Sequence, residues 1–431
     1  SITDLSHEGR GIAHINGKIT FIQDALPGET VLIQTTKKNR QYEEAKATEI
    51  LISSPDRVKP KCLHYGICGG CNLQHFNAQA QLHHKEKVLL TQLKHVARIQ
   101  PGTLLSPLKA KSWGYRRRAR LGVKYVTKKQ AVLIGFRERN GRYLAQLQTC
   151  ETLEPKIGQL ILPLQSLISS LKAYQLIPQI EAALGDEVLA LIFRHLAPLE
   201  IEDIEKLKVF AQKYQLQFYL QPGNESTIHC IWPETNPKPL SYRLNKGKLL
   251  RKTLELFFKP SYFIQINAAI NQSMIDCAME LLAPNSSDQI LDLFCGIGNF
   301  SLPLATQCQQ VIGVEGSPEL VEYAKKNAMH NDISNVQFHT ADLSIPIKEQ
   351  AWSRKSFNKL LLDPPRSGAF EIIQQISSWE IERIVYVSCN PATLARDAAE
   401  LVKQGYKLAS TGVLDMFPHT HHSEAICLFT K

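Results

Sequence analysis

Residues 291–305, LDLFCGIGNFSLPLA, have the pattern of a buried strand, a glycine-rich turn and the first turns of a helix. Gly296 and Gly298 permit a tight turn and let the backbone approach a ligand with no Cβ in the way. A dinucleotide-binding fingerprint would need a third glycine where this chain has Ser301. The stretch therefore predicts a strand of a parallel α/β sheet with a ligand at its carboxyl end, without identifying that ligand.

Acidic residues follow three of the next strands. VIGVEG brings Glu315 to a strand end, where a carboxylate can accept both ribose hydroxyls of a nucleoside cofactor. Asp342 follows the strand VQFHT and can bind an adenine amino group, and KLLLDPPRSG ends its strand at Asp363. This order of elements resembles the class I S-adenosylmethionine-dependent methyltransferases. A nicotinamide-dependent dehydrogenase is the alternative, but it does not account for the Asp-Pro-Pro element.

A cysteine follows the next strand, in IVYVSCNPATLARD (384–397). Cys389 would lie at a strand end where open α/β sheets bind ligands, and the following helix could lower the pKa of its thiol. Methylation of a pyrimidine at C5 needs a thiolate that adds to C6 and a base that later removes the C5 proton. Arg366, where amine methyltransferases have an aromatic residue, favours a carbon target. A buried structural cysteine is the alternative for Cys389, and we expect Cys295 only to pack.

Five stretches together resemble the RNA uracil-5 methyltransferases: FIQIN (263–267), LDLFCGIGNF, LLDPPRSG, YVSCNPATLARD and DMFPHTHHSEAICLF (415–429). The resemblance implies Cys389 as the nucleophile and Glu424 as the base that removes the C5 proton. It also implies a set of residues around S-adenosylmethionine, namely Gln265, Phe294, Gly296, Asn299, Glu315, Asp342 and Asp363. The chain has Asp-Pro-Pro-Arg where some relatives have Asp-Pro-Ala-Arg, a change that keeps Asp363 and Arg366.

Residues 1–55 are expected to form a small β-barrel of the OB type. Asn16-Gly17 lies between two alternating runs, which is the strongest short signal for a hairpin. On this pattern alone, nucleic-acid binding and simple packing against the rest of the chain are equal alternatives. The segment GRGIAHINGKITFIQDALPGETV resembles a TRAM domain, which implies RNA binding.

Three cysteines lie close together in CLHYGICGGC, at Cys62, Cys68 and Cys71, and Cys150 can supply a fourth thiolate. Four thiolates suit either zinc or a [4Fe–4S] cluster, and spacing alone does not separate the two. The Cys-x3-Cys-x2-Cys spacing of radical S-adenosylmethionine enzymes is absent. The family resemblance implies a [4Fe–4S] cluster with a structural role.

The stretch WGYRRRARLGVKY (113–125) is strongly basic and is flanked by aromatic residues. Arginine binds phosphate and aromatic rings stack on unpaired bases, whereas a basic run by itself is usually a solvated face. In an RNA enzyme the stretch, flanked by Trp113, Tyr115 and Tyr125, becomes a candidate for RNA binding, and the resemblance implies that Arg120 reaches the active site. The predicted RNA-binding set is Arg116, Arg117, Arg118, Arg120 and Phe263.

The composition agrees with an enzyme that acts on nucleic acid. A net charge of +10 and a pI near 9.0 favour a polyanionic partner. No window approaches about 18 uninterrupted apolar residues, so we expect no membrane span. The first residues lack a secretory pattern, and we therefore expect a cytoplasmic protein whose ten cysteines are not disulfides.

The sequence thus predicts three parts: a TRAM-like barrel (1–55), a mixed α+β iron–sulfur domain (56–258) and a class I, Rossmann-like methyltransferase domain (259–431). The expected activity is S-adenosylmethionine-dependent methylation of uracil C5, and the resemblance implies 23S ribosomal RNA as the partner of a monomeric enzyme. Three alternatives are the same chemistry on tRNA or another rRNA site, an RNA cytosine-5 methyltransferase, and a non-catalytic iron–sulfur RNA-binding protein. The helix expected at 79–96 packs either on the central domain or on the catalytic one.

Overall fold

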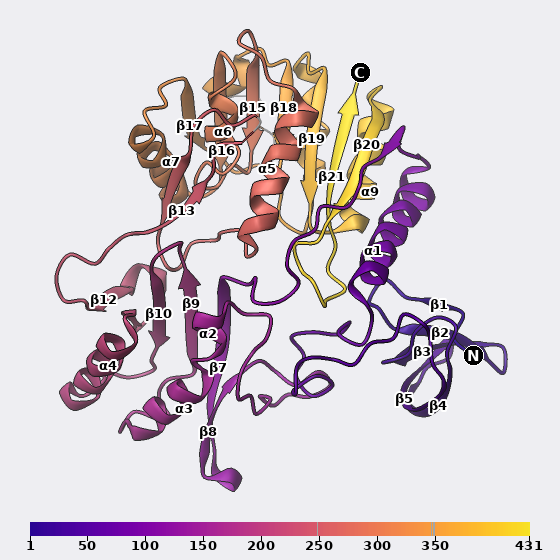
Figure 1. Ribbon diagram of the computed structural model, residues 1–431. Helices are drawn as coiled ribbons and strands as arrows, with labels where there is room; N and C mark the ends of the chain where they lie inside the picture. The colour runs from indigo at the N-terminus through magenta and orange to yellow at the C-terminus, as the bar shows by residue number, and fades with distance from the viewer. Residues whose placement is uncertain (248, 346, 348–349) are drawn as a thin grey trace.

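The computed structural model of the chain describes residues 1–247, 249–345, 347 and 350–431. The described strands form sheets of five, six, two and eight strands. In Figure 1 the eight-stranded sheet lies at the top, the six-stranded sheet at the lower left and the five-stranded sheet at the lower right. None of the helices within these ranges is long and apolar enough to cross a membrane.

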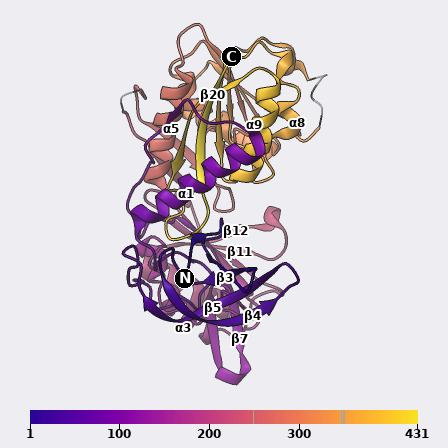
Figure 2. The ribbon, with the colours of Figure 1, turned by 90° about the vertical axis from the view of Figure 1, so that its right-hand side faces the viewer.

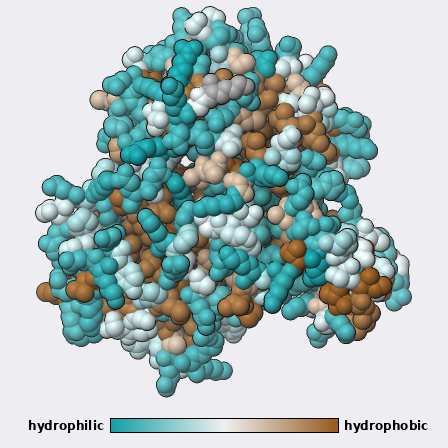
Figure 3. Space-filling view, viewed as in Figure 1, coloured by the Kyte–Doolittle hydropathy of each residue, from teal (hydrophilic) through white to brown (hydrophobic). Residues whose placement is uncertain are grey.

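Five strands form the N-terminal sheet, in the order β1-β2-β3-β5-β4. Their bounds are Asp4–Leu5 (β1), Gly11–Ile15 (β2), Lys18–Gln23 (β3), Thr30–Lys38 (β4) and Tyr42–Ile52 (β5). The hairpin predicted at Asn16-Gly17 is confirmed, because both residues have the positive φ, 51° and 78°, that a type I′ turn requires. Exposed apolar side chains gather on this sheet, where Figure 3 shows brown surface at the lower right: Ile15, Ile19, Leu32, Leu51 and Ile52.

The central sheet has the order β12-β11-β10-β9-β7-β8. Its strands are Arg118–Val126 (β7), Ala131–Gly135 (β8), Gln179–Leu184 (β9), Leu189–Arg194 (β10), Gln217–Gln221 (β11) and His229–Trp232 (β12). Its helices are Pro155–Gly158 (α2), Ile161–Ser170 (α3) and Ile201–Tyr214 (α4), with 3-10 turns at Thr127–Lys129 (η2) and Glu225–Thr227 (η3). Leu164 and Ile168 of α3 and Leu207 of α4 are buried in a core formed with these strands, so this part has a core of its own.

The helix α1 (Ala78–Gln92) does not pack on this central sheet. With the π-helical turn η1 (Leu93–Ala97), it buries Leu82, Leu89 and Leu93 in the core of the eight-stranded sheet. The short strand β6 (Thr103–Leu104) then pairs with an edge of that sheet. Figure 2 shows α1 lying between the N-terminal sheet and the catalytic part. Of the two domains on which this helix was expected to pack, the structure shows that it packs on the methyltransferase domain.

The eight-stranded sheet has the order β17-β16-β15-β18-β19-β21-β20-β6. Its other strands are Gln289–Leu293 (β15), Gln310–Glu315 (β16), Val336–Thr340 (β17), Lys359–Leu362 (β18), Arg383–Ser388 (β19), Lys407–Leu414 (β20) and Glu424–Thr430 (β21). The helices are Ala268–Leu282 (α5), Ser301–Ala305 (α6), Pro318–His330 (α7), Phe370–Ile373 (α8) and Pro391–Lys403 (α9), with 3-10 turns at Ala351–Arg354 (η4) and Ile376–Ser378 (η5). α5, α6 and α7 pack in one core, and α1, α8 and α9 pack in another. The sheet is therefore the middle of three layers, as predicted for an α/β methyltransferase.

The strand order reverses between β15 and β18. The chain runs from β15 outward to β16 and β17, and then returns across the sheet to β18 and β19, all in parallel. Open α/β sheets bind their ligands at the carboxyl ends of the strands beside such a reversal. The glycine turn that follows β15 lies at this position.

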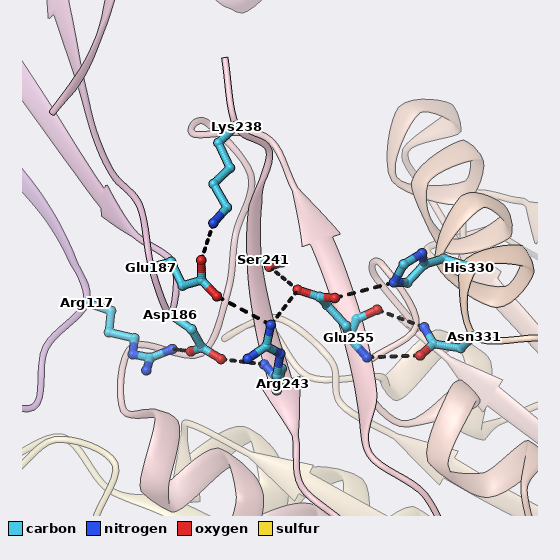
Figure 4. A network of polar contacts seen from close by, with 9 residues as sticks. All are labelled: Arg117, Asp186, Glu187, Lys238, Ser241, Arg243, Glu255, His330 and Asn331. Atoms are coloured by element: carbon cyan, nitrogen blue, oxygen red, sulfur yellow. Dashed lines mark hydrogen bonds and ion pairs between the residues drawn. The ribbon is translucent and has the colours of Figure 1, made fainter. Parts of the chain in front are cut away.

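A two-stranded hairpin, Leu240–Leu244 (β13) and Leu254–Phe258 (β14), connects the central and catalytic parts. Asp186, in the turn between β9 and β10, accepts a hydrogen bond from Arg117 (2.8 Å) and another from the backbone N–H of Arg243 (2.8 Å). Glu255, opposite Arg243 in the hairpin, also contacts His330 at the end of α7 (3.4 Å). Figure 4 shows this network running from the central sheet to α7. It fixes the hairpin, whose Tyr242 side chain lines the main cavity.

Candidate active site and cofactor pocket

A cavity of about 970 Å³ opens at the carboxyl ends of the central strands of the catalytic sheet. Its volume is at the upper end of the usual range for ligand pockets. All the residues predicted as catalytic or cofactor-binding line it: Gln265, Phe294, Gly296, Asn299, Glu315, Asp342, Asp363, Cys389 and Glu424. Of the predicted RNA-binding residues, Arg116 and Phe263 also line it.

The glycine turn after β15 is open toward this cavity. Phe294, Gly296 and Gly298 all have positive φ, and a Cβ built at Gly296 would meet no atom within 4 Å. The backbone N–H of Gly296 donates to the carboxylate of Glu315 (3.2 Å), which also accepts from the N–H of Ser317 (3.1 Å). The turn and the end of β16 therefore hold the Glu315 carboxylate at the cavity wall.

The side-chain amide of Asn299 forms hydrogen bonds within the protein through both Oδ1 and Nδ2. Its Oδ1 accepts from the Tyr242 hydroxyl (2.8 Å) and from Asn271 Nδ2 (3.1 Å), and its Nδ2 donates to Asn271 Oδ1 (2.9 Å). Asn299 therefore holds the end of the glycine turn against α5 and the β13–β14 hairpin. Sequence reasoning gave no role to Tyr242 or Asn271, because each lies in a segment with no motif.

Three acids in and beside the cavity have different environments. Burial raises the pKa of Asp363 to about 7, although Gln265 Nε2 donates to it (3.4 Å) and opposes the shift. Asp342 is exposed, and hydrogen bonds from the side chain and backbone of Ser344 lower its pKa. Asp292, two residues before Phe294, is completely buried, and burial raises its pKa to about 8. Asp292 had no predicted role. Its position inside an apolar strand was the one feature of the sequence that could have indicated a buried carboxyl group.

Cys389 and Glu424 face each other across two neighbouring strands. Ser388 of β19 pairs with Ala425 of the antiparallel strand β21, so the next residues, Cys389 and Glu424, lie opposite one another at the cavity. Asn390 caps α9 by accepting from the N–H of Ala392 (3.1 Å). The cap ends the strand directly after Cys389, and it leaves the thiol at the cavity wall.

Burial raises the pKa of both side chains. Burial raises the pKa of Cys389 to about 11, with Glu424 adding to the shift and Arg366 opposing it. Burial also raises the pKa of Glu424, which is 3% exposed, well above its usual range, again with Arg366 opposing. The net shift is thus opposite to the lowering that the α9 N-terminus could give, because desolvation of the thiolate outweighs the effect of Arg366.

Cys62, Cys68, Cys71 and Cys150 line a second cavity, of about 260 Å³. Burial raises the pKa of Cys71 to about 12, and the thiols of Cys150, Cys68 and Cys62 raise it further. The structure thus brings the distant Cys150 to the other three, as expected. Within the described residues, no group of three or more His, Cys, Asp or Glu side chains is arranged to hold a single metal ion. The assignment of a metal cluster to these cysteines therefore stays a prediction.

The arginines of the basic stretch have different partners. Arg117 pairs with Asp186, and Arg118 donates to the carbonyl oxygens of Pro260, Ser261 and Tyr262. Arg120 bonds Glu181 (2.9 Å), but its side chain is 69% exposed. Phe263, on the cavity rim, is 68% exposed. Arg116, the remaining member of the predicted RNA-binding set, lies at the cavity wall.

The aromatic residues of that stretch pack within the protein. Tyr115 is buried and its hydroxyl donates to the carbonyl of Pro418 (3.0 Å), so its ring is not free to stack on a base. The Trp113 ring stacks on His419, with centroids 3.8 Å apart, and Tyr125 contacts Tyr174 edge to face. Trp113 and Tyr115 therefore support the segment that leads to Glu424.

Comparison with known proteins agrees with this site. A profile described as tRNA (Uracil-5-)-methyltransferase matches residues 245–431, and a TRAM domain profile matches residues 1–48. The crystal structure of Pyrococcus abyssi tRNA (uracil-54, C5)-methyltransferase in complex with S-adenosyl-L-homocysteine shows the same fold, with a TM-score of 0.74 at 24% identity over 100% of this chain and 99% of that one. Fold and site together define a methyltransferase of the uracil-5 class with an N-terminal TRAM domain.

Full-length relatives narrow this class. A protein of Nitrosococcus oceani described as 23S rRNA (uracil(1939)-C(5))-methyltransferase RlmD is 49% identical, over 100% of this chain and 95% of the relative. A protein of Alkalilimnicola ehrlichii with the same description is 46% identical, over 100% and 96%. The chain belongs to the RlmD family.

Proposed function

We propose that this protein methylates C5 of a uracil in 23S rRNA, at the position that corresponds to uracil 1939 named for its relatives. The observation that carries the proposal is the pairing of Cys389 with Glu424 across β19 and β21, beside the glycine turn. A nucleophile, a base and a cofactor pocket in one cavity are what this reaction requires.

S-adenosylmethionine fits the residues around the glycine turn. The free space at Gly296 accommodates a ligand against the backbone, and the Glu315 carboxylate is positioned to accept ribose hydroxyls. Asp342, Phe294, Gln265 and Asp363 complete the lining, with Asn299 supporting the turn. When bound, the cofactor supplies an electrophilic methyl group, whose bond to the sulfonium sulfur breaks with the electron pair remaining on sulfur.

Cys389 would begin the reaction by adding to C6 of the uracil. Its sulfur forms a bond to C6, and the C5–C6 π electrons move toward C4 and O4, which makes C5 nucleophilic. After C5 has gained a methyl group, the Glu424 carboxylate takes the C5 proton. The C5–H electrons restore the C5–C6 double bond, and the C6–S bond breaks to return the thiolate of Cys389. Since the pKa of the Cys389 thiol is raised to about 11, the thiol must lose its proton before it adds to C6, and the raised pKa of Glu424 makes its carboxylate a stronger base.

RNA must deliver a base that has left its stack, because the cavity lies inside the protein. Phe263 presents an exposed ring at the rim of the cavity. Arg116 supplies positive charge at the cavity wall, and Arg120, in β7, supplies a largely exposed positive charge. We propose that these three residues grip the RNA around the target. Arg117 and Arg118 would act mainly by holding the protein surface in shape, since their partners are internal.

The four cysteines would hold a [4Fe–4S] cluster. The four cysteines line one cavity, which supports a shared site, and the family resemblance favours the cluster over zinc. The cluster's contribution there would be structural cross-linking of residues 62–71 to residue 150. Anaerobic purification should yield about four iron and four sulfide per chain. A colourless protein with stoichiometric zinc would overturn the assignment.

The experiment that tests the proposed function transfers labelled methyl groups from S-adenosylmethionine to unmodified 23S rRNA and maps the modified base. We expect one modified uracil, at the site equivalent to 1939, and no transfer by Cys389→Ala. Unmodified tRNA serves as the competing substrate. Preferential methylation of tRNA, or of a cytosine, would overturn the proposal.

A further inference from the structure

The β20–β21 loop, defined here as residues 415–423, leads directly to Glu424, the first residue of β21. Two strands anchor its ends, but the loop itself is held by segments far away in the sequence. Lys85 of α1, 1% exposed, donates to Asp415 (2.9 Å) and to the carbonyl of Phe417 (3.0 Å). Gln81 of the same helix accepts from the N–H of His419 (2.9 Å). The first half of the loop is therefore fixed to α1.

The second half of the loop is fixed by the segment next to Cys71. The backbone N–H groups of Asn72 and Leu73 both donate to the carbonyl of His419 (3.1 and 3.0 Å). Asn72 Oδ1 accepts from the N–H of His421 (3.0 Å), and Asn72 Nδ2 contacts His421 Nδ1 (3.0 Å) while donating to the carbonyl of Glu8 (2.8 Å). Asn72 thus joins the N-terminal sheet, the cysteine segment and the loop at one point.

This contact lies close to the proposed base. His421 precedes Glu424 by three residues, and His422 between them lines both cavities and contacts Arg366 (2.8 Å). A shift of the loop at His421 would pass along this short segment to the Glu424 carboxylate. A catalytic base that is displaced by about 1 Å from the proton it removes loses much of the rate acceleration that it provides.

We propose that Asn72 is a positioning residue for Glu424, acting through the backbone of His421 on the step that removes the C5 proton. The inference rests on the proposed function. It predicts that loss of the Asn72 side chain slows release of the methylated base from Cys389 while leaving the earlier addition and methyl transfer nearly unchanged. A purely structural role would slow all steps together.

The test follows a single turnover with uridine RNA and labelled S-adenosylmethionine, sampling both methylated RNA and protein–RNA adduct that survives denaturation. For Asn72→Ala we expect methyl transfer within about threefold of wild type, release slowed about tenfold, and accumulation of methylated adduct, which we also expect of Glu424→Gln. Asn72→Asp, which keeps the acceptor for the His421 N–H, should accumulate less adduct than Asn72→Ala. Asn140→Ala, which removes an exposed amide that bonds Gln23, is the matched control and should accumulate none.

Slow methyl transfer without adduct in both Asn72 variants would overturn the inference, and so would adduct in the Asn140→Ala control. If Asn72→Ala does not fold, Asn72→Leu, which has a similar shape and also removes the acceptor for the His421 N–H, takes its place; adduct above the wild-type level then supports the inference, and its absence contradicts it. Failure of the proposed function is seen separately, as a wild-type protein that methylates no RNA.

Discussion

Replacing Asp292 by asparagine is expected to stabilise the protein by an amount that grows as the pH rises. The carboxyl group lies in β15 at 0% exposure, with Ser301 donating to Oδ2 and with no hydrogen-bond partner at Oδ1 among the described residues. Burial raises its pKa to about 8, and the nearby charges of Asp363 and Glu315 add to that effect. Asparagine has nearly the same shape as the protonated acid and cannot ionise.

The sign follows from the protons bound in each state. In the unfolded chain Asp292 ionises near its ordinary pKa of 3.8, and in the folded protein near 8. Between these values the folded state binds more protons, so the free energy of unfolding falls as the pH rises. At about 1.4 kcal/mol per pKa unit, ionisation of Asp292 costs about 2 kcal/mol at pH 5 and about 5 kcal/mol at pH 8. The buried amide N–H groups of asparagine cost about 1–3 kcal/mol at every pH, so the slope with pH is the observable.

Urea unfolding from pH 5 to 8, followed by the fluorescence of Trp352 and Trp379 in the catalytic core, measures this slope. The advantage of Asp292→Asn over wild type should grow by about 3 kcal/mol across the range. Asp288→Asn is the control with opposite sign, because Asp288 is buried but Lys359 (2.6 Å) and other donors hold its pKa below its ordinary value. That variant should be less stable at every pH tested. A wild-type-to-Asp292→Asn difference that does not change with pH would refute the reasoning.

Three further predictions concern the reaction itself. Phe263→Ala should weaken RNA binding by about tenfold in a fluorescence anisotropy titration, because a stacked base is lost, while cofactor affinity stays the same; unchanged RNA affinity would show that the exposed ring contacts no base. Tyr242→Phe should weaken S-adenosylmethionine binding by about threefold to tenfold in calorimetry, because Asn299 loses a hydrogen bond that fixes the glycine turn. Equal affinity of the two proteins would show that this hydrogen bond does not support the cofactor pocket. The first-turnover rate of methyl transfer should rise about tenfold per pH unit between pH 7 and 9, because the Cys389 thiol has its pKa raised to about 11; a flat rapid-quench profile would contradict a thiol that is protonated at rest.

The parallel half of the catalytic sheet was predictable because its signals are local. Each strand there is an apolar run that ends in a turn, and Asn16-Gly17 marks the N-terminal hairpin in the same way. The packing partner of α1 was not predictable, since the helix buries polar side chains such as Gln81 and Lys85 beside Leu82 and Leu89, and this mixture does not identify the surface that it covers. The antiparallel position of β21 between β19 and β20 was not predictable either, because the sequence of a strand does not indicate which distant strand it pairs with.

The candidate site also contains residues that local sequence predicts and residues whose roles depend on distant pairing. Glu315, Asp363 and Cys389 follow apolar strands, so their convergence on one cavity could be predicted from the order of the elements. Glu424 could not be identified from local pattern, because its role depends on the register that places it opposite Cys389. Tyr115 shows the opposite case: an aromatic residue among arginines suggests base stacking, but its ring is buried against the β20–β21 loop.

The most direct test of the account is whether Cys389 becomes covalently bound to the target base. RNA in which 5-fluorouridine replaces the target uridine cannot lose a proton from C5 after methylation, so the reaction should stop as a methylated protein–RNA adduct that survives denaturation. We expect this adduct with the wild-type protein and S-adenosylmethionine, mapped by mass spectrometry to Cys389, and we expect none with Cys389→Ala. An adduct that still forms with Cys389→Ala, or that maps to another cysteine, would contradict the account.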